Sequence, residues 1–196
     1  MKTLIKNFGV NKLNIKNARY VSIDSSSKSV AFAILNKSGV DVELVHVAKL
    51  IFPTGSSMRD KLELINSYIP ALFQTYGPID HVVIEQTIYI QSPQTSRILS
   101  YIVGHVWGKC LEYCDDVIDV PIMTWKSHIG YKNVSKQEKA QWDKEFGPAE
   151  SKKIAARERK DRTGNIVRQK ISNIDHLNDN DIMDAIAIGL WAVDNV

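Results

Sequence analysis

The sequence predicts a single α/β domain built on a mixed five-stranded sheet, with helices on both faces of the sheet. Three apolar segments near the N-terminus are separated only by tight polar turns, which is typical of consecutive β-hairpins. Helical segments then alternate with short apolar segments, which indicates parallel strands joined by helices. The 196 residues, of which 44% are hydrophobic and 24% charged, suit one globular domain of ordinary size.

The three hairpin strands are expected at residues 20–24, 30–36 and 42–52. The serine-rich turn over residues 25–29 joins the first two, and the turn at residues 36–39 joins the second to the third. A right-handed crossover would place the next strand beside the first. The first strand is therefore expected at the centre of the sheet.

Helices and buried strands are expected to alternate after the hairpins. Apolar residues recur at intervals of three and four over residues 57–75, which predicts an amphipathic helix, and residues 94–114 predict a second. The apolar runs at residues 81–85 and 116–121 predict strands, and the first of them suits burial on both faces, as in parallel pairing.

The last third of the chain is predicted to be helical and is basic. Residues 135–162 are expected to be helical with a break at Gly147-Pro148, and residues 180–193 form the closing helix. Between Lys126 and Lys170 lie 13 of the 25 Lys and Arg residues but 6 of the 22 Asp and Glu residues. Such a segment is expected of a protein that binds nucleic acid or another polyanion, although a solvated helical surface has the same composition.

Residues 1–19 carry five basic residues and no acidic one, and we expect them to form a basic arm before a domain that spans residues 20–196. The arm lacks the apolar stretch of a secretory signal, and it has too little Ser and Arg for a mitochondrial presequence. We therefore expect a cytoplasmic protein. There is no run of 18 apolar residues, so no membrane span is expected. Cys110 and Cys114 are interpreted as reduced core thiols.

Four carboxylates stand where the predicted fold brings them together. Asp24 and Glu85 each end a predicted strand, at the carboxyl edge of the sheet where α/β proteins bind ligands. A charge there loses solvation unless something pairs with it. Asp181 and Asp184 are three residues apart and therefore share one face of the closing helix. Small residues after them allow that helix to lie close to the sheet.

Converging carboxylates require cations, because like charges raise each other's pKa. Oxygen ligands without His or Cys predict Mg²⁺ or Mn²⁺. Two such ions, about 4 Å apart, are typical of nucleases and polymerases. Taken singly, Asp24 also fits a brace for the serine turn, and Asp181 fits the first turn of a helix. Glu85, which follows Val-Val-Ile in an interior strand, has no such structural explanation.

Three motifs resemble those of the RuvC-like Holliday junction resolvases, which belong to the RNase H-like nuclease superfamily. The motifs are Ile23-Asp-Ser-Ser-Ser27, Ile84-Glu-Gln86 and Asp181-Ile-Met-Asp-Ala-Ile-Ala-Ile188, and the resemblance covers residues 20–194. It implies an RNase H-like fold. It also implies a structure-selective endodeoxyribonuclease that resolves four-way DNA junctions by paired, metal-dependent phosphodiester hydrolysis on opposed strands.

The same resemblance implies the metal ligands and the partners. Asp24, Glu85, Asp181 and Asp184 would hold two Mg²⁺ ions, for which Mn²⁺ would substitute. Members of the family act as homodimers, so the helix over residues 94–114 is expected to help form the dimer interface. Branched DNA is the expected partner, in a bacterial or phage-infected cell.

The resemblance further implies DNA contacts. The segment that ends at Lys126 is similar to the stretch in which members carry a DNA-contacting lysine, and Lys152 or Lys153 fits a second such lysine at the start of the following helix. In the family, an aromatic side chain soon after the motif glutamate wedges into the junction. Ile88 falls at that place, and Tyr89 beside it offers an aromatic surface.

Ile88 at the aromatic position is one departure from the family; there are two others, and three alternatives stay open. Ser replaces the usual Gly of the first turn, and residues 131–150 look like a basic insertion that extends the DNA surface or forms a solvated loop. A nuclease for flaps, other branched DNA or RNA–DNA hybrids needs the same acids. An actin-like kinase or ATPase fragment does not require Asp181 and Asp184. A DNA-binding protein without activity would not need all four carboxylates.

Overall fold

The computed structural model describes residues 17–87 and 92–196. The strands are β1 (Ala18–Ser25), β2 (Ser29–Ser38), β3 (Asp41–Ile51), β4 (His81–Glu85) and β5 (Val117–Val120). The helices are α1 (Met58–Tyr76), α2 (Pro93–Leu111), α3 (Ile122–His128), α4 (Lys136–Phe146), α5 (Pro148–Lys170) and α6 (Asn180–Asn195). None of the helices in these two ranges is long and apolar enough to cross a membrane.

The five strands form one mixed sheet in the order β3-β2-β1-β4-β5. β2 is antiparallel to both β1 and β3, whereas β4 is parallel to both β1 and β5. The predicted sheet of three hairpin strands and two parallel strands is therefore confirmed, and β1 is central as expected. β1 begins at Ala18, so Arg19 belongs to the sheet rather than to the predicted arm, of which residues 1–16 lie outside the described ranges.

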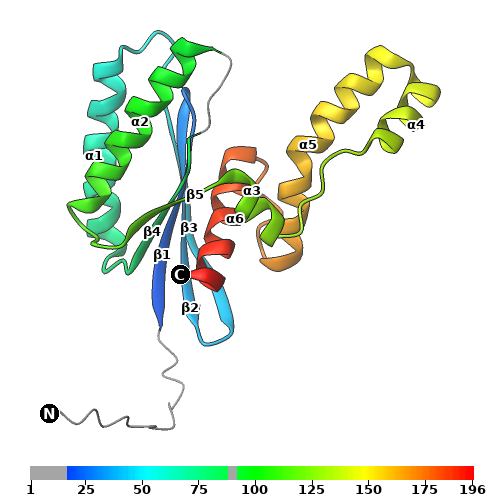
Figure 1. The fold of residues 1–196 in the computed structure, drawn as a ribbon. Helices are drawn as coiled ribbons and strands as arrows, with labels where there is room; N and C mark the ends of the chain where they lie inside the picture. The colour runs from blue at the N-terminus through cyan, green and yellow to red at the C-terminus, as the bar shows by residue number, and fades with distance from the viewer. Residues whose placement is uncertain (1–16, 88–91) are drawn as a thin grey trace, which may run out of the picture.

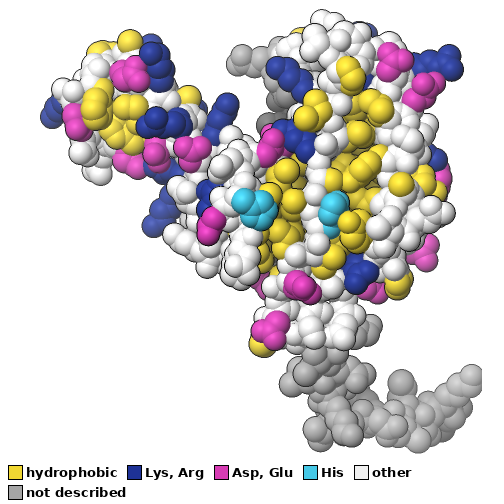
Figure 2. Space-filling view, turned by 180° about the vertical axis from the view of Figure 1, so that it is seen from behind, with side chains coloured by type: hydrophobic (Ala, Val, Ile, Leu, Met, Phe, Trp, Pro, Cys, Tyr) yellow, Lys and Arg dark blue, Asp and Glu magenta, His cyan; other side chains and the backbone are white. Residues whose placement is uncertain are grey.

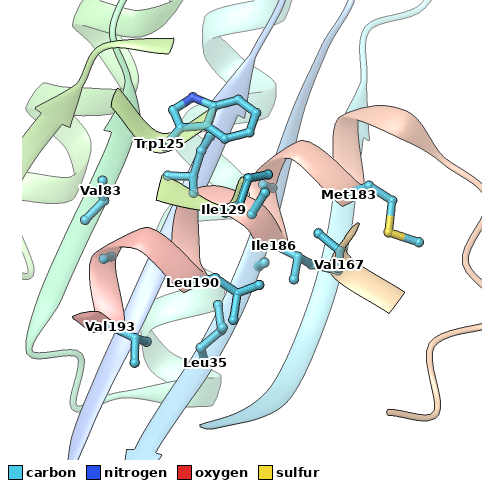
Figure 3. Close-up of a cluster of buried hydrophobic side chains, with 14 of the residues drawn as sticks. Leu35, Val83, Trp125, Ile129, Val167, Met183, Ile186, Leu190 and Val193 are labelled. Atoms are coloured by element: carbon cyan, nitrogen blue, oxygen red, sulfur yellow. The ribbon is translucent and has the colours of Figure 1, made fainter. Parts of the chain in front are cut away.

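Helices cover both faces of the sheet (Figure 1). α1 and α2 pack on the face to which Val21 and Ile23 of β1 point. α6 packs on the other face, with α3 and the C-terminal part of α5 beside it, in a core that includes Leu35 (Figure 3). Side chains alternate along a strand, so Ser22 and Asp24 face α6.

α6 lies unusually close to β1 and β2. A Cβ atom on Gly189 would lie 2.3 Å from Leu35 Cδ1 and 2.7 Å from Ser22 Oγ, so only glycine fits this contact. Four residues earlier on α6, the backbone carbonyl of Ala185 accepts a hydrogen bond of 2.7 Å from Ser22 Oγ. These contacts fix the height of α6 above the sheet, and with it the positions of the carboxylates in its first turns.

α4 and α5 form a helical hairpin that projects from the sheet (Figure 1). The predicted break at Gly147-Pro148 is confirmed, but α5 continues to Lys170 instead of ending at residue 162. Its last turns are held because Thr163 and Val167 are buried beside α6. α3 is not among the predicted elements, because seven residues are too few to show a helical period.

Candidate active site

Asp24 and Glu85 are neighbours on adjacent parallel strands. Ser22 of β1 pairs with Val83 of β4 and Ile23 with Ile84, so one further step along both strands puts Asp24 beside Glu85. Adjacent strands lie about 4.8 Å apart. Both side chains belong to the set that faces α6, because residues two apart point to the same side. The predicted pair at the carboxyl edge of the sheet is thus present.

Asp184 completes a group of three partly buried carboxylates from β1, β4 and α6. Burial raises the pKa of Asp24 well above its ordinary value, and the charges of the other carboxylates add to this, Glu85 the most. Burial also raises the pKa of Glu85 to about 7, with the charge of Asp184 as the next cause. The pKa of Asp184 is raised as well, again chiefly by burial. The three groups therefore repel one another within a poorly solvated site.

Two side chains of neighbouring helices orient these carboxylates. The indole Nε1 of Trp125, a fully buried residue of α3, donates a hydrogen bond of 3.0 Å to Glu85 Oε2. The hydroxyl of Thr163, which is buried on α5, hydrogen-bonds the Asp184 carboxylate and lowers its pKa. Both donors favour the charged form of their acceptor. α3 thus holds Glu85 of the sheet in place, and α5 holds Asp184 of α6.

Lys126 is the basic side chain of α3 that acts on all three of these carboxylates. Its charge lowers the pKa of Asp24, of Glu85 and of Asp184. Its ammonium lies 5.0 Å from the ring centre of Trp125 and 5.1 Å from that of Tyr131. Such cation–π contacts hold a lysine in a defined direction. The structure therefore brings the predicted DNA-contacting lysine to the carboxylate group.

Asp181, the fourth predicted carboxylate, is held by different partners. Its Oδ2 atom lies 2.8 Å from Lys49 Nζ of β3 and accepts a hydrogen bond of 2.9 Å from Ser29 Oγ of β2. Lys49 also pairs with Asp179, at 2.7 Å. Asp179 caps α6 by accepting hydrogen bonds from the backbone N–H groups of Asp181 and Ile182. The charge of Asp181 thus acts on Asp24 and Asp184, but Asp181 already has a cationic partner.

The donor set suits a hard divalent cation. Within residues 17–87 and 92–196, no three acidic, His or Cys side chains stand close enough to hold a metal ion as they are placed. The chemistry nevertheless fits, because Asp24, Glu85 and Asp184 offer carboxylate oxygens alone. Their pKa values are raised by burial and, to a smaller extent, by neighbouring carboxylates, and a divalent cation would favour their charged forms. Side-chain movements would be needed to bring oxygens of all three carboxylates onto one ion.

The amino-acid sequence matches no protein-family model and no curated protein, whereas the structure resembles solved structures. *Thermus thermophilus* RuvC in complex with a Holliday junction substrate superposes with a TM-score of 0.67 over 90% of this chain and 93% of RuvC, at 12% identity. The chain has the RuvC fold. The yeast mitochondrial Holliday junction resolvase Ydc2 gives a TM-score of 0.55 over 90% of this chain and 78% of Ydc2, also at 12% identity.

The RuvC fold confirms the fold class that the three motifs predict. A second *Thermus thermophilus* RuvC structure gives a TM-score of 0.63 over 89% of this chain and 93% of RuvC, at 13% identity. At such identities the likeness is one of fold. The mixed sheet with α1 and α2 on one face and α6 on the other is the arrangement shared with RuvC.

Other predicted residues lie away from the carboxylates or outside the described ranges. Lys152 and Lys153 stand in the first turns of α5, where Ser151 Oγ donates a hydrogen bond of 3.4 Å to the Lys139 carbonyl of α4. They therefore belong to the projecting hairpin of the RuvC-like domain. Ile88 and Tyr89 lie outside the described residues, and the wedge stays a prediction.

Sequence reasoning missed four residues of the site: Ser29, Lys49, Trp125 and Thr163. Lys49 carried a signal, because it is a charged residue inside an apolar strand, and the hairpin register places it on the side of Asp24. The other three carried none. A tryptophan in a short segment and a threonine in a basic helix are found in many environments.

Proposed function

We propose that the protein is a structure-selective endodeoxyribonuclease that resolves four-way DNA junctions by metal-dependent hydrolysis of phosphodiester bonds. The observation that carries this proposal is the convergence of Asp24, Glu85 and Asp184 at the carboxyl edge of a RuvC-like sheet. The Holliday junction bound to *Thermus thermophilus* RuvC supports a four-way junction as the substrate.

Asp24, Glu85 and Asp184 would hold the divalent metal, with Mg²⁺ or Mn²⁺ as the ion that carboxylate oxygens favour. When bound, the metal would supply an activated water and charge stabilisation at the cleaved phosphate. The chain itself keeps the site poorly solvated, and it orients Glu85 through Trp125 and Asp184 through Thr163. Binding of a second metal ion, as the resemblance implies, would require Asp181 as an additional ligand.

The DNA would lie across α3 and along the projecting hairpin. Lys126, whose charge acts on the carboxylates, would meet the phosphate next to the cleaved bond. Along α4 and α5, basic and acidic side chains are interspersed over the surface (Figure 2). Lys152 and Lys153 at the start of α5 would contact a more distant part of the backbone, and residues 131–150 would act as an insertion that extends this surface.

Paired cleavage of opposed strands requires two active sites, and α2 is the proposed dimer contact. Its Tyr101 side chain is 55% exposed, and a Cβ atom on Gly104 or Gly108 would meet nothing within 4 Å. A second copy of the chain could therefore approach this part of α2 closely. A symmetric contact of this kind would bring one carboxylate group to each of two junction strands.

The test is cleavage by the purified protein in Mg²⁺ of four substrates: an immobile four-way junction, a flap, a linear duplex and an RNA–DNA hybrid. Symmetric nicks on opposed junction strands, absent with Asp24→Asn, are the expected result. If the flap or the hybrid is cut as readily as the junction, the result would support nuclease activity but contradict selectivity for four-way junctions. Binding of the junction without cleavage of any substrate would contradict the proposed nuclease activity.

A further inference from the structure

A row of residues crosses the sheet from the carboxylates to Lys49. Glu85 neighbours Asp24, Asp24 pairs with Ala31 on β2, and Ala31 pairs with Lys49 on β3. Residues paired in this way point to the same face of a sheet, here the face covered by α6. Because Ala31 is small and fully buried, the Lys49 side chain has a path over it to the start of α6.

Lys49 ends in two close ion pairs. Its Nζ atom lies 2.7 Å from Asp179 Oδ2 and 2.8 Å from Asp181 Oδ2. The side chain of Lys49 is only 20% exposed, and that of Asp181 is 36% exposed. Ser29 Oγ donates to the same Asp181 oxygen at 2.9 Å. One oxygen of Asp181 thus receives two donors, one of them a full positive charge.

We propose that Lys49 is a positioning residue that takes the place of a second cation at Asp181. The inference rests on the proposed metal site and deepens it. In the resting protein the carboxylates bind one divalent ion, through Asp24, Glu85 and Asp184. A second ion binds at Asp181 only if it displaces the ammonium of Lys49. Lys49 therefore sets the affinity of the second ion.

A purely structural role for Lys49 makes a different prediction. Neutralising Asp179, the N-terminal cap of α6, would explain the pair at 2.7 Å and would affect stability alone. It would not require an equally short contact to Asp181 on the side of the other carboxylates. The two roles are separated by counting bound metal ions, because a stabilising ion pair does not change how many ions bind.

The experiment is titration of the metal-free full chain with Mn²⁺, with free Mn²⁺ measured by electron paramagnetic resonance. Wild type is expected to bind one ion tightly, and Lys49→Met is expected to bind a second ion at least tenfold more tightly than wild type does. Lys37→Met is the matched control, because Lys37 also joins the sheet to α6, through the Val193 carbonyl at the far end of the helix. Lys37→Met should bind Mn²⁺ as wild type does.

A second variant, Lys49→Gln, keeps the test usable if the methionine variant unfolds by circular dichroism. Identical titrations for wild type and a folded Lys49 variant would overturn the inference. The proposed metal site is judged separately by Asp24→Asn, which should lose the first ion. Full Mn²⁺ binding by Asp24→Asn would overturn that site, and absence of binding by every variant would overturn both.

Discussion

Trp125 Nε1 donates a hydrogen bond of 3.0 Å to Glu85 Oε2, which ties a fully buried indole of α3 to a carboxylate at the edge of β4. A buried carboxylate usually has a strongly raised pKa, because burial disfavours its charge. The indole opposes this effect, since the bond lowers the pKa of Glu85. Trp125 therefore does more than fill the core: it helps to keep Glu85 charged for a metal ion.

Replacing Trp125 with Phe is expected to raise the pKa of Glu85 above its present value of about 7, because the donor is lost while burial remains. Mn²⁺ binding should then require a higher pH, and the free energy of unfolding should fall by about 1–2 kcal/mol. Trp191→Phe, on the solvent side of the same core, is the control. Equal pH profiles of Mn²⁺ binding for the two variants would show that Trp125 acts only in packing.

The metal-free protein is expected to lose stability as the pH rises from about 4.5 to about 7. The pKa of Glu85 is about 7 in the folded chain against an ordinary 4.5. Below this window both states hold the proton. Within it the unfolded chain releases a proton that the folded chain keeps, which favours unfolding by about 3 kcal/mol at most above pH 7. Urea titrations with a chelator at both ends of the window measure this.

One variant and one metal addition check the origin of that pH dependence. Glu85→Gln should remove a large part of the slope, because it cannot titrate. Mg²⁺ added near neutral pH should restore stability to the wild type by binding only the folded state. A slope that is unchanged in Glu85→Gln would assign the effect to other groups and contradict the account of this site.

Gly189→Ala is expected to destabilise the fold by about 1–3 kcal/mol, because its methyl group would clash with Leu35 and Ser22 and push α6 off the sheet. The displacement would also separate Asp184 from Asp24 and weaken Mn²⁺ binding. Thermal unfolding of this variant is compared with that of the wild type, and an unchanged melting temperature would refute the close approach of α6.

Lys126→Met is expected to weaken junction binding and to reduce the slope of log affinity against log salt by about one ion. Lys152→Ala with Lys153→Ala should have a similar effect on binding. Only Lys126→Met should also alter the pH dependence of Mn²⁺ binding, because its charge acts on the carboxylates. Fluorescence anisotropy at several salt concentrations measures the slopes, and an unchanged slope for either variant would remove that contact.

The fold and the carboxylate group could be predicted because their signals are local. Strand alternation sends Asp24 and Glu85 to one face, and the spacing of Asp181 and Asp184 puts them on one side of a helix. The partner of Asp181 could not be predicted with the same assurance. Lys49 is placed by pairing across three strands, and the register of β2 with β3 shifts between Ile34 and Leu35.

The contribution of α3 to the site could not be predicted from the sequence for a different reason. A helix of seven residues shows too little periodicity to reveal which side chain is buried. The sequence therefore does not show that Trp125 is buried and bonded to Glu85, or that the charge of Lys126 acts on the carboxylates. The length of the hairpin also depends on tertiary contacts. α5 continues beyond residue 162 because Thr163 and Val167 are buried beside α6. The hydrophobic pattern of such a highly charged helix does not predict this burial.

The most direct test of the central claim uses a supercoiled plasmid that extrudes a cruciform, which is a four-way junction within closed DNA. Two paired nicks made within one complex convert this plasmid to a linear molecule, whereas single nicks give an open circle. We predict linear product from the wild type in Mg²⁺ and neither product from Asp24→Asn. Open circles alone from the wild type, or linear product from Asp24→Asn, would contradict a paired metal-dependent resolvase.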